Sequence, residues 1–92
     1  MIVEWSISAT QDARRVYNFI ADMNPQAADV VMGDIFRFIT LLKEQPRLGR
    51  VLGRYQNRDV RSSIVGRYEV RYEIVSNKII ILRIWHVREY RE

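Results

Sequence analysis

The sequence predicts a small α+β fold in which a helical hairpin packs on one face of a small, mainly antiparallel, twisted sheet. Apolar residues recur at helical spacing through the first half of the chain and at every second position through the last third. These patterns give the element order β-α-α-β-β-β, with one short strand before the helices. We expect residues 1–92 to form a single domain, because a chain of this length supports one economical core.

A short strand and an amphipathic helix come first. The strand is expected at residues 2–6. Ser8 and Gln11 fit a capping box, in which both side chains satisfy free backbone N–H groups, so the helix is predicted to begin near Ala9. The apolar stripe of this helix recurs every three or four positions and comprises Ala9, Ala13, Val16, Ile20 and Met23.

A second helix follows at once, because Asn24 is a good N-cap and Pro25 suits the first helical position. The short link makes the two helices antiparallel neighbours. Gly33 costs about 1 kcal/mol relative to Ala in mid-helix, so we expect it where the helices approach closely. The apolar stripe is wider than one core face requires and comprises Ala28, Val31, Met32, Ile35, Phe36, Phe38, Ile39 and Leu42.

Residues 46–59 lose this periodicity and are predicted to form a surface loop, a candidate binding surface because long loops often carry function. Three antiparallel strands are then expected at residues 60–65, 68–74 and 78–85. In the middle strand, Tyr68 and Tyr72 share a face that we expect to pack beneath the helices.

Composition excludes several kinds of site. The chain has no Cys and one His, which removes thiolate chemistry and argues against zinc, so we expect no metal and no cofactor. The first five residues include an acid and no basic segment, and no apolar run approaches the ~20 residues that cross a bilayer. We therefore expect a cytoplasmic protein with no membrane contact.

Basic charge is concentrated in the second half of the chain. Residues 47–92 carry eleven Lys or Arg against five acids, whereas residues 1–46 carry four against six. Arg, which makes bidentate contacts to carboxylate and phosphate, accounts for thirteen of the fifteen cations. This distribution predicts an acidic partner, either nucleic acid or an acidic protein segment.

A set of short motifs follows the predicted elements from Trp5 to Arg88. In chain order they are Trp5, Ala9 with Asp12, Asn24-Pro25-x-Ala27-Ala28, Pro46-x-x-Gly49-Arg50, Tyr68-x-Val70-x-Tyr72 and Ile81-Leu82-Arg83-Ile84-Trp85-His86-x-Arg88. Together they resemble the RelE/ParE toxin superfamily, and the Asn-Pro, Gly-Arg and last-strand motifs are most similar to its ParE branch. The resemblance implies a toxin of a type II toxin–antitoxin system that inhibits DNA gyrase. It also implies a cognate antitoxin, through which alone operator DNA would be reached.

The same resemblance leaves a second function open, a RelE-like ribosome-dependent endonuclease acting on mRNA. His86 would then exchange the proton, and Arg61 and Arg83 would stabilise the developing charge. No residue matches the base that nuclease members use, with Glu69 the nearest carboxylate, which favours the gyrase interpretation. A non-toxic RNA-binding or regulatory domain is the third alternative.

Candidate site residues follow from these interpretations. We expect Arg61, Arg83 and Arg88 to converge on the sheet face away from the helices. A structural role for His86, paired with backbone or a carboxylate, is weighed above a catalytic one, and Arg71 is expected to pair with nearby acids on a solvated face. The candidate target-binding residues are Arg83, His86, Arg88, Arg50, Arg54 and Arg58. The candidate antitoxin-binding residues are Phe36, Phe38 and Ile39. Residues 87–92 are left open between an irregular tail and a last helical turn.

Overall fold

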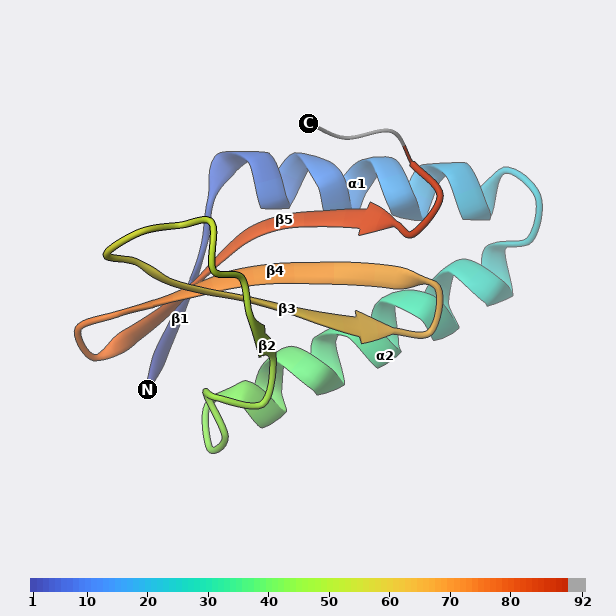
Figure 1. Ribbon diagram of the computed structural model, residues 1–92. Coiled ribbons are helices and arrows are strands. Elements are labelled where there is room, and N and C mark those ends of the chain that lie inside the picture. The colour runs from blue at the N-terminus through green and yellow to red at the C-terminus, as the bar shows by residue number, and fades with distance from the viewer. Residues whose placement is uncertain (90–92) are drawn as a thin grey trace.

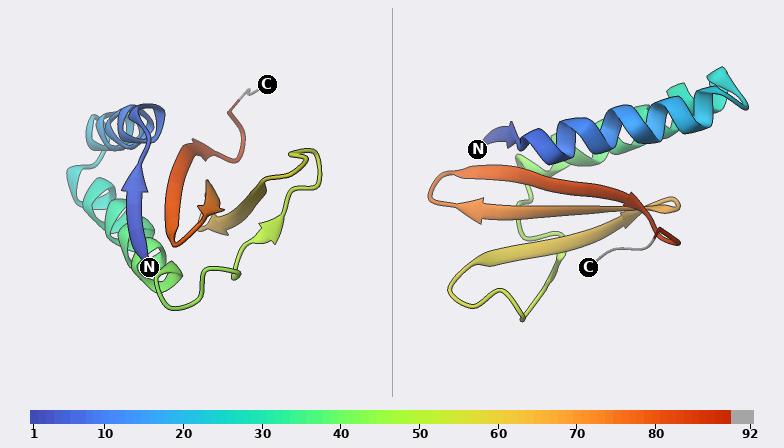
Figure 2. Two further views of the ribbon diagram at one scale, coloured as in Figure 1. Left: turned by 90° about the vertical axis from the view of Figure 1, so that its left-hand side faces the viewer. Right: turned by 90° about the horizontal axis from the view of Figure 1, so that it is seen from above.

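A helical hairpin covers one face of a five-stranded sheet in the computed structural model, which describes residues 1–89 (Figure 1). The view along the strands shows the two layers side by side (Figure 2). The predicted fold class and element order are confirmed, with one strand added. In chain order the elements are β1 (Ile2–Trp5), α1 (Ile7–Ala21), α2 (Pro25–Leu42), β2 (Arg50–Val51), β3 (Asp59–Val65), β4 (Tyr68–Val75) and β5 (Lys78–His86).

The sheet has the strand order β1-β5-β4-β3-β2. β1 pairs in parallel with the first half of β5, and the other neighbours are antiparallel, as predicted for the last three strands. β1 ends at Trp5, opposite Ile81, and leaves the second half of β5 with a free edge. α1 lies along that edge, which explains why polar side chains of α1 reach the backbone of β5.

The predicted start of α1 was wrong by two residues. Ser6, not Ser8, is the N-cap, and its Oγ accepts the N–H of Ala9 at 2.9 Å. The same hydroxyl donates to the carbonyl of Leu82 at 2.9 Å, so Ser6 satisfies the helix end and the strand edge together. At the other end α1 stops at Ala21, and Met23 is 80% exposed rather than part of the apolar stripe.

The second helix begins as predicted, with the side chain of Asn24 accepting the N–H of Ala27 at 3.1 Å and Pro25 in the first turn. Gly33 was wrongly assigned to a close approach between the helices. An added Cβ at Gly33 would meet only the side chain of Arg37, on the same helix. The position therefore has room for a larger residue.

The core lies between the hairpin and the sheet. Val70 and Tyr72 of β4 are fully buried beneath the helices, which confirms that this face of the strand is the inner one. Tyr68 is partly buried against the same cluster, and Trp5 meets Phe36 edge-on at 5.8 Å. The fully buried members with the largest side chains are Tyr72, Ile35, Leu42, Ile79, Ile81, Ile84, Val60 and Val70.

The segment predicted as a loop contains β2, a two-residue strand that pairs with β3. The hydroxyl of Tyr72 fixes the start of this segment, because it accepts the N–H of Gly49 at 2.8 Å and donates to the carbonyl of Pro46 at 2.8 Å. An added Cβ at Gly49 would lie 2.7 Å from that hydroxyl oxygen, so a side chain does not fit. The Pro-x-x-Gly motif thus attaches the segment to the core.

Beyond β5 the chain turns back, with the N–H of Glu89 donating to the carbonyl of His86 at 3.0 Å. The rest of the predicted tail, residues 90–92, lies outside the described residues. Neither of the two helices in the described part is both long and apolar enough to cross a membrane.

Candidate functional site

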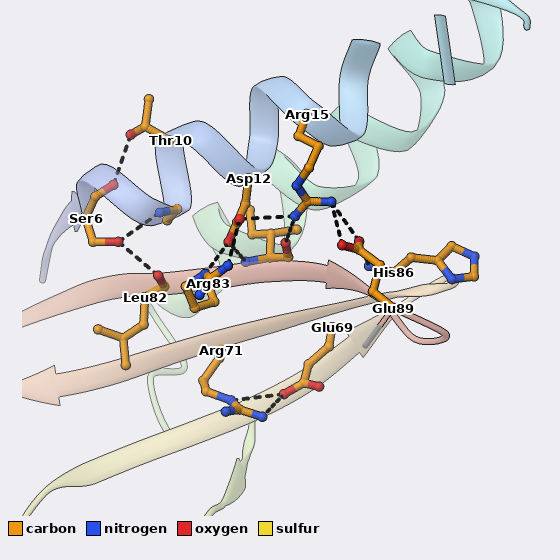
Figure 3. A network of polar contacts seen from close by, with 12 residues as sticks. Ser6, Thr10, Asp12, Arg15, Glu69, Arg71, Leu82, Arg83, His86 and Glu89 are labelled. Carbon is orange, nitrogen blue, oxygen red and sulfur yellow. Dashed lines mark hydrogen bonds and ion pairs between the residues drawn. The ribbon is translucent and has the colours of Figure 1, made fainter. Parts of the chain in front are cut away.

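Arg83 is held at the edge of the sheet by Asp12 of α1 (Figure 3). Its Nε and Nη2 donate to the carboxylate at 2.7 and 3.1 Å, and the hydrogen bond to Asp12 raises the pKa of Arg83. Asp12 also accepts the N–H of Ile84 at 2.9 Å and a bond from Arg15 at 3.1 Å. Burial alone would raise the pKa of Asp12, but these donors outweigh it and the pKa is lowered.

A second ion pair joins α1 to the chain beyond β5. Nη1 of Arg15 donates to both carboxylate oxygens of Glu89, at 2.8 and 2.7 Å, and the backbone N–H of His86 donates to the same carboxylate at 2.9 Å. Burial opposes the charged form of Glu89, yet the bonds from His86 and Arg15 lower its pKa overall. Figure 3 shows the resulting chain of contacts from Arg83 through Asp12 and Arg15 to Glu89.

Arg61 does not join Arg83, so the predicted convergence on one face was wrong. Arg61 stands opposite Tyr72 across β3 and β4, and Tyr72 points into the core beneath the helices. Its guanidinium pairs with Asp59 at 2.9 Å and donates to the carbonyl of Gly49 at 3.1 Å. Arg61 therefore fastens the β2 segment from the helix-facing side of the sheet.

Arg83 belongs to the opposite face. It stands across from Arg71 of β4, and both guanidinium carbons lie over the ring of Trp85, at 4.8 and 4.7 Å. Arg71 pairs with Glu69 at 2.9 Å, as predicted, but on a covered face rather than a solvated one. Both side chains are buried, and Tyr55 of the β2–β3 loop accepts a bond from Arg71 at 3.0 Å.

The arginines of this loop have separate surroundings. Arg54 and Arg58 each lie 5.4 Å from the ring centroid of Tyr55, and Arg58 pairs with Glu73 at 2.8 Å. Burial would raise the pKa of Tyr55, but bonds from Arg54 and Arg71 lower it. Arg50 is exposed on β2.

His86 has the backbone contacts of a strand-end histidine. Its Nδ1 accepts the N–H of Arg88 at 3.0 Å, and its ring meets Tyr68 edge-on at 5.2 Å. An acceptor at Nδ1 requires the neutral ring with its proton on Nε2. Burial raises the pKa of Tyr68, so this hydroxyl also stays protonated near neutral pH.

The side of α1 next to His86 is hollowed. A pocket of about 520 Å³ opens there, lined by Arg15, Val16, Phe19, Tyr68, His86, Arg88 and Glu89. Sequence reasoning missed Phe19, which is 69% exposed although it is large and apolar. The signal was available, because Phe19 falls outside the helical stripe of the first helix. Within residues 1–89 no group of three or more potential metal ligands comes together.

The candidate antitoxin residues on α2 are in unequal positions. Ile39 is 5% exposed within the core, and Phe38 packs partly buried against it. Phe36 is 49% exposed beside Trp5. Of this apolar set, Phe36 alone offers a large exposed surface.

Comparison with known proteins now identifies the family. The family model described as "ParE toxin of type II toxin-antitoxin system, parDE" matches residues 3–90. The chain belongs to the ParE toxin family. Among solved structures it is similar to the chromosomal ParDE toxin–antitoxin system of P. aeruginosa, with a TM-score of 0.75 and 20% sequence identity over 94% of this chain and 95% of that one. A search of the curated proteins finds no match. This ParE toxin thus keeps the family fold around the Asp12–Arg83 and Gly49–Tyr72 contacts.

Proposed function

We propose that this ParE toxin acts in the cytoplasm by binding and inhibiting DNA gyrase, and that a cognate antitoxin neutralises it. The separation of Arg61 from Arg83 carries the proposal. Cleavage of a ribose–phosphate backbone needs a base, an acid and cations around one phosphate. Because these two arginines lie on opposite faces of the sheet and bind internal partners, the geometry favours a binding toxin over a nuclease.

The contacts of His86 add support. A general acid at this position requires the imidazolium, but Nδ1 accepts the N–H of Arg88 and so favours the neutral ring. The nearest carboxylate of the middle strand, Glu69, is bound by Arg71 and by the hydroxyl of Ser62, at 2.9 Å each. It is therefore not poised to accept a proton from a substrate.

The proposed gyrase contacts are the cations that remain open to a partner. Arg50, Arg54 and Arg88 are exposed, and Arg58 and Arg83 keep nearly half of their side-chain surface exposed while paired. Exposed arginines of this kind pair well with acidic protein surfaces. We propose two contact regions, the β2–β3 loop and the end of β5 with Arg83, His86 and Arg88.

Antitoxin binding is proposed from the family and from the charge of the chain. The matching family consists of toxins of two-protein systems, and the similar P. aeruginosa structure is of such a system. A protein with net charge +4 suits an acidic partner segment. In this proposal operator DNA is contacted through the antitoxin.

Induction of the toxin alone in growing bacteria tests the proposal. The expected result is loss of plasmid supercoiling while the 5′ ends of translated mRNA, mapped by primer extension, stay unchanged. New mRNA ends that disappear in His86→Ala, with normal supercoiling, would replace the proposal by the ribosome-dependent nuclease. Co-expression of the antitoxin provides the control and should restore supercoiling.

A further inference from the structure

Two apolar hollows meet at Tyr68, at the end of the sheet where β4 begins and β5 ends. The first is the pocket of about 520 Å³ beside His86, and the second, of about 320 Å³, lies against the β3–β4 turn. Tyr68 lines both hollows, and we call them together the Tyr68 trough. Its other apolar lining residues are Val16, Phe19, Ile20, Val31 and Val65.

The rim of the Tyr68 trough is basic. Arg67 lines the second hollow and Arg88 the first, and within residues 1–89 neither forms an ion pair. The N–H of Val87 donates to the carbonyl of Arg67 at 2.9 Å, which holds both cations at the same end of the sheet. The charge of Arg15 is already matched by Glu89. The rim therefore presents unmatched positive charge beside an apolar floor.

We infer that the Tyr68 trough binds an acidic, amphipathic helix of the antitoxin, which places apolar side chains in the two hollows and carboxylates against Arg67 and Arg88. Two adjacent hollows along α1 suit the successive apolar anchors of one helix face. The exposed ring of Phe19 supplies the kind of aromatic contact that dominates such interfaces. This inference rests on the proposed neutralisation by an antitoxin and names the surface that it uses.

The charge of the rim and the state of α2 favour this location over the hairpin surface around Phe36. Ile39 and Phe38 are taken up by the core, which leaves Phe36 without exposed apolar neighbours from that set. The acids Asp34 and Asp29 are exposed on α2, and they would oppose an acidic segment there. The Tyr68 trough combines a hollow, an apolar lining and a basic rim.

The test measures the affinity of the purified toxin for the full-length cognate antitoxin by calorimetry. Phe19→Ala should weaken binding by at least about tenfold, as loss of a central aromatic anchor does. The matched control is Val30→Ala, which truncates another exposed apolar residue of the hairpin and should leave the affinity unchanged. Phe36→Ala reports on the competing surface. Equal affinity for Phe19→Ala and wild type, or a larger loss in Phe36→Ala, overturns the inference.

A second pair of variants tests the charge of the rim. Arg67→Glu combined with Arg88→Glu should weaken binding and flatten its dependence on salt, whereas Lys43→Glu at the far end of α2 should do neither. Supercoiling by gyrase is measured on the same samples without antitoxin. Reduced antitoxin affinity with no gyrase inhibition by wild type would sink the gyrase proposal and keep this inference. An antitoxin that does not bind wild type would sink both the proposed neutralisation and this inference.

Discussion

The carboxylate of Asp12 accepts two hydrogen bonds from Arg83, 71 positions later in the chain, and ties α1 to the edge of β5 where β1 has ended. Asp12 also accepts the N–H of Ile84, a backbone donor that the sheet leaves unpaired at this edge. An aspartate near the start of the first helix is therefore a structural requirement of this fold.

Removal of this carboxylate should destabilise the protein strongly. Asp12→Ala leaves the buried N–H of Ile84 without its acceptor and Arg83 without its counter-ion, at an expected cost of about 2–4 kcal/mol. Asp34→Ala removes the exposed Arg37 pair instead and should cost less than about 1 kcal/mol. Urea unfolding of both variants measures the difference, and similar midpoints would contradict the assigned role.

Stability should fall in acid through the same residues. The pKa values of Asp12 and Glu89 are lowered in the folded protein, so the stability they contribute is present above their unfolded values of about 4 and is lost as the pH falls through the folded values. Wild type should therefore lose more unfolding free energy than Asp12→Asn between neutral pH and acid. Unfolding curves that shift in parallel for the two proteins would contradict this assignment.

The β2 segment should depend on the fit of Gly49 against Tyr72. Gly49→Ala places a methyl group 2.7 Å from the tyrosine hydroxyl, and we expect it to cost about 1–3 kcal/mol. Gly53→Ala has nothing within 4 Å of its added Cβ and should be neutral or slightly stabilising. Thermal unfolding of both variants decides the matter, since equal melting temperatures would mean that the segment yields to the methyl group.

The buried pair on the outer face of the sheet should behave unlike a surface pair. Glu69→Ala leaves the covered guanidinium of Arg71 without its carboxylate and should destabilise the protein by about 3–5 kcal/mol. Glu4→Ala breaks the exposed contact with Lys78, at 3.4 Å, and provides the control with little expected effect. Chemical denaturation compares the two, and a small loss in Glu69→Ala would show that the face is open to water.

Periodicity was sufficient to predict both helices and the last three strands, because each spans several turns or several alternations. It was not sufficient for β2, since two residues show no period and their pairing depends on β3. The start of α1 was misplaced because two serines satisfy the local pattern, and Ser6 is selected by its bond to Leu82, which no local pattern contains.

The candidate site was harder to predict, because it depends on how the strands are aligned. Simple alternation along β5 puts Arg83 on the same face as Ile81, in the core. The register shift opposite Arg71 and Tyr72 leaves Leu82 as an extra residue, so that Arg83 joins Arg71 on the outer face and Ile84 returns to the core. The sequence gives no period for such a bulge, and the Tyr68 trough likewise forms only when α1 and the end of β5 come together.

The central claim, that this ParE toxin inhibits gyrase and does not cleave RNA, is tested most directly with purified components. Relaxed plasmid is incubated with DNA gyrase, ATP and increasing amounts of the toxin, and supercoiled product is measured on a gel. We predict that supercoiling declines with toxin concentration and recovers when the antitoxin is added. Full supercoiling at toxin concentrations that cleave mRNA on translating ribosomes would contradict the account.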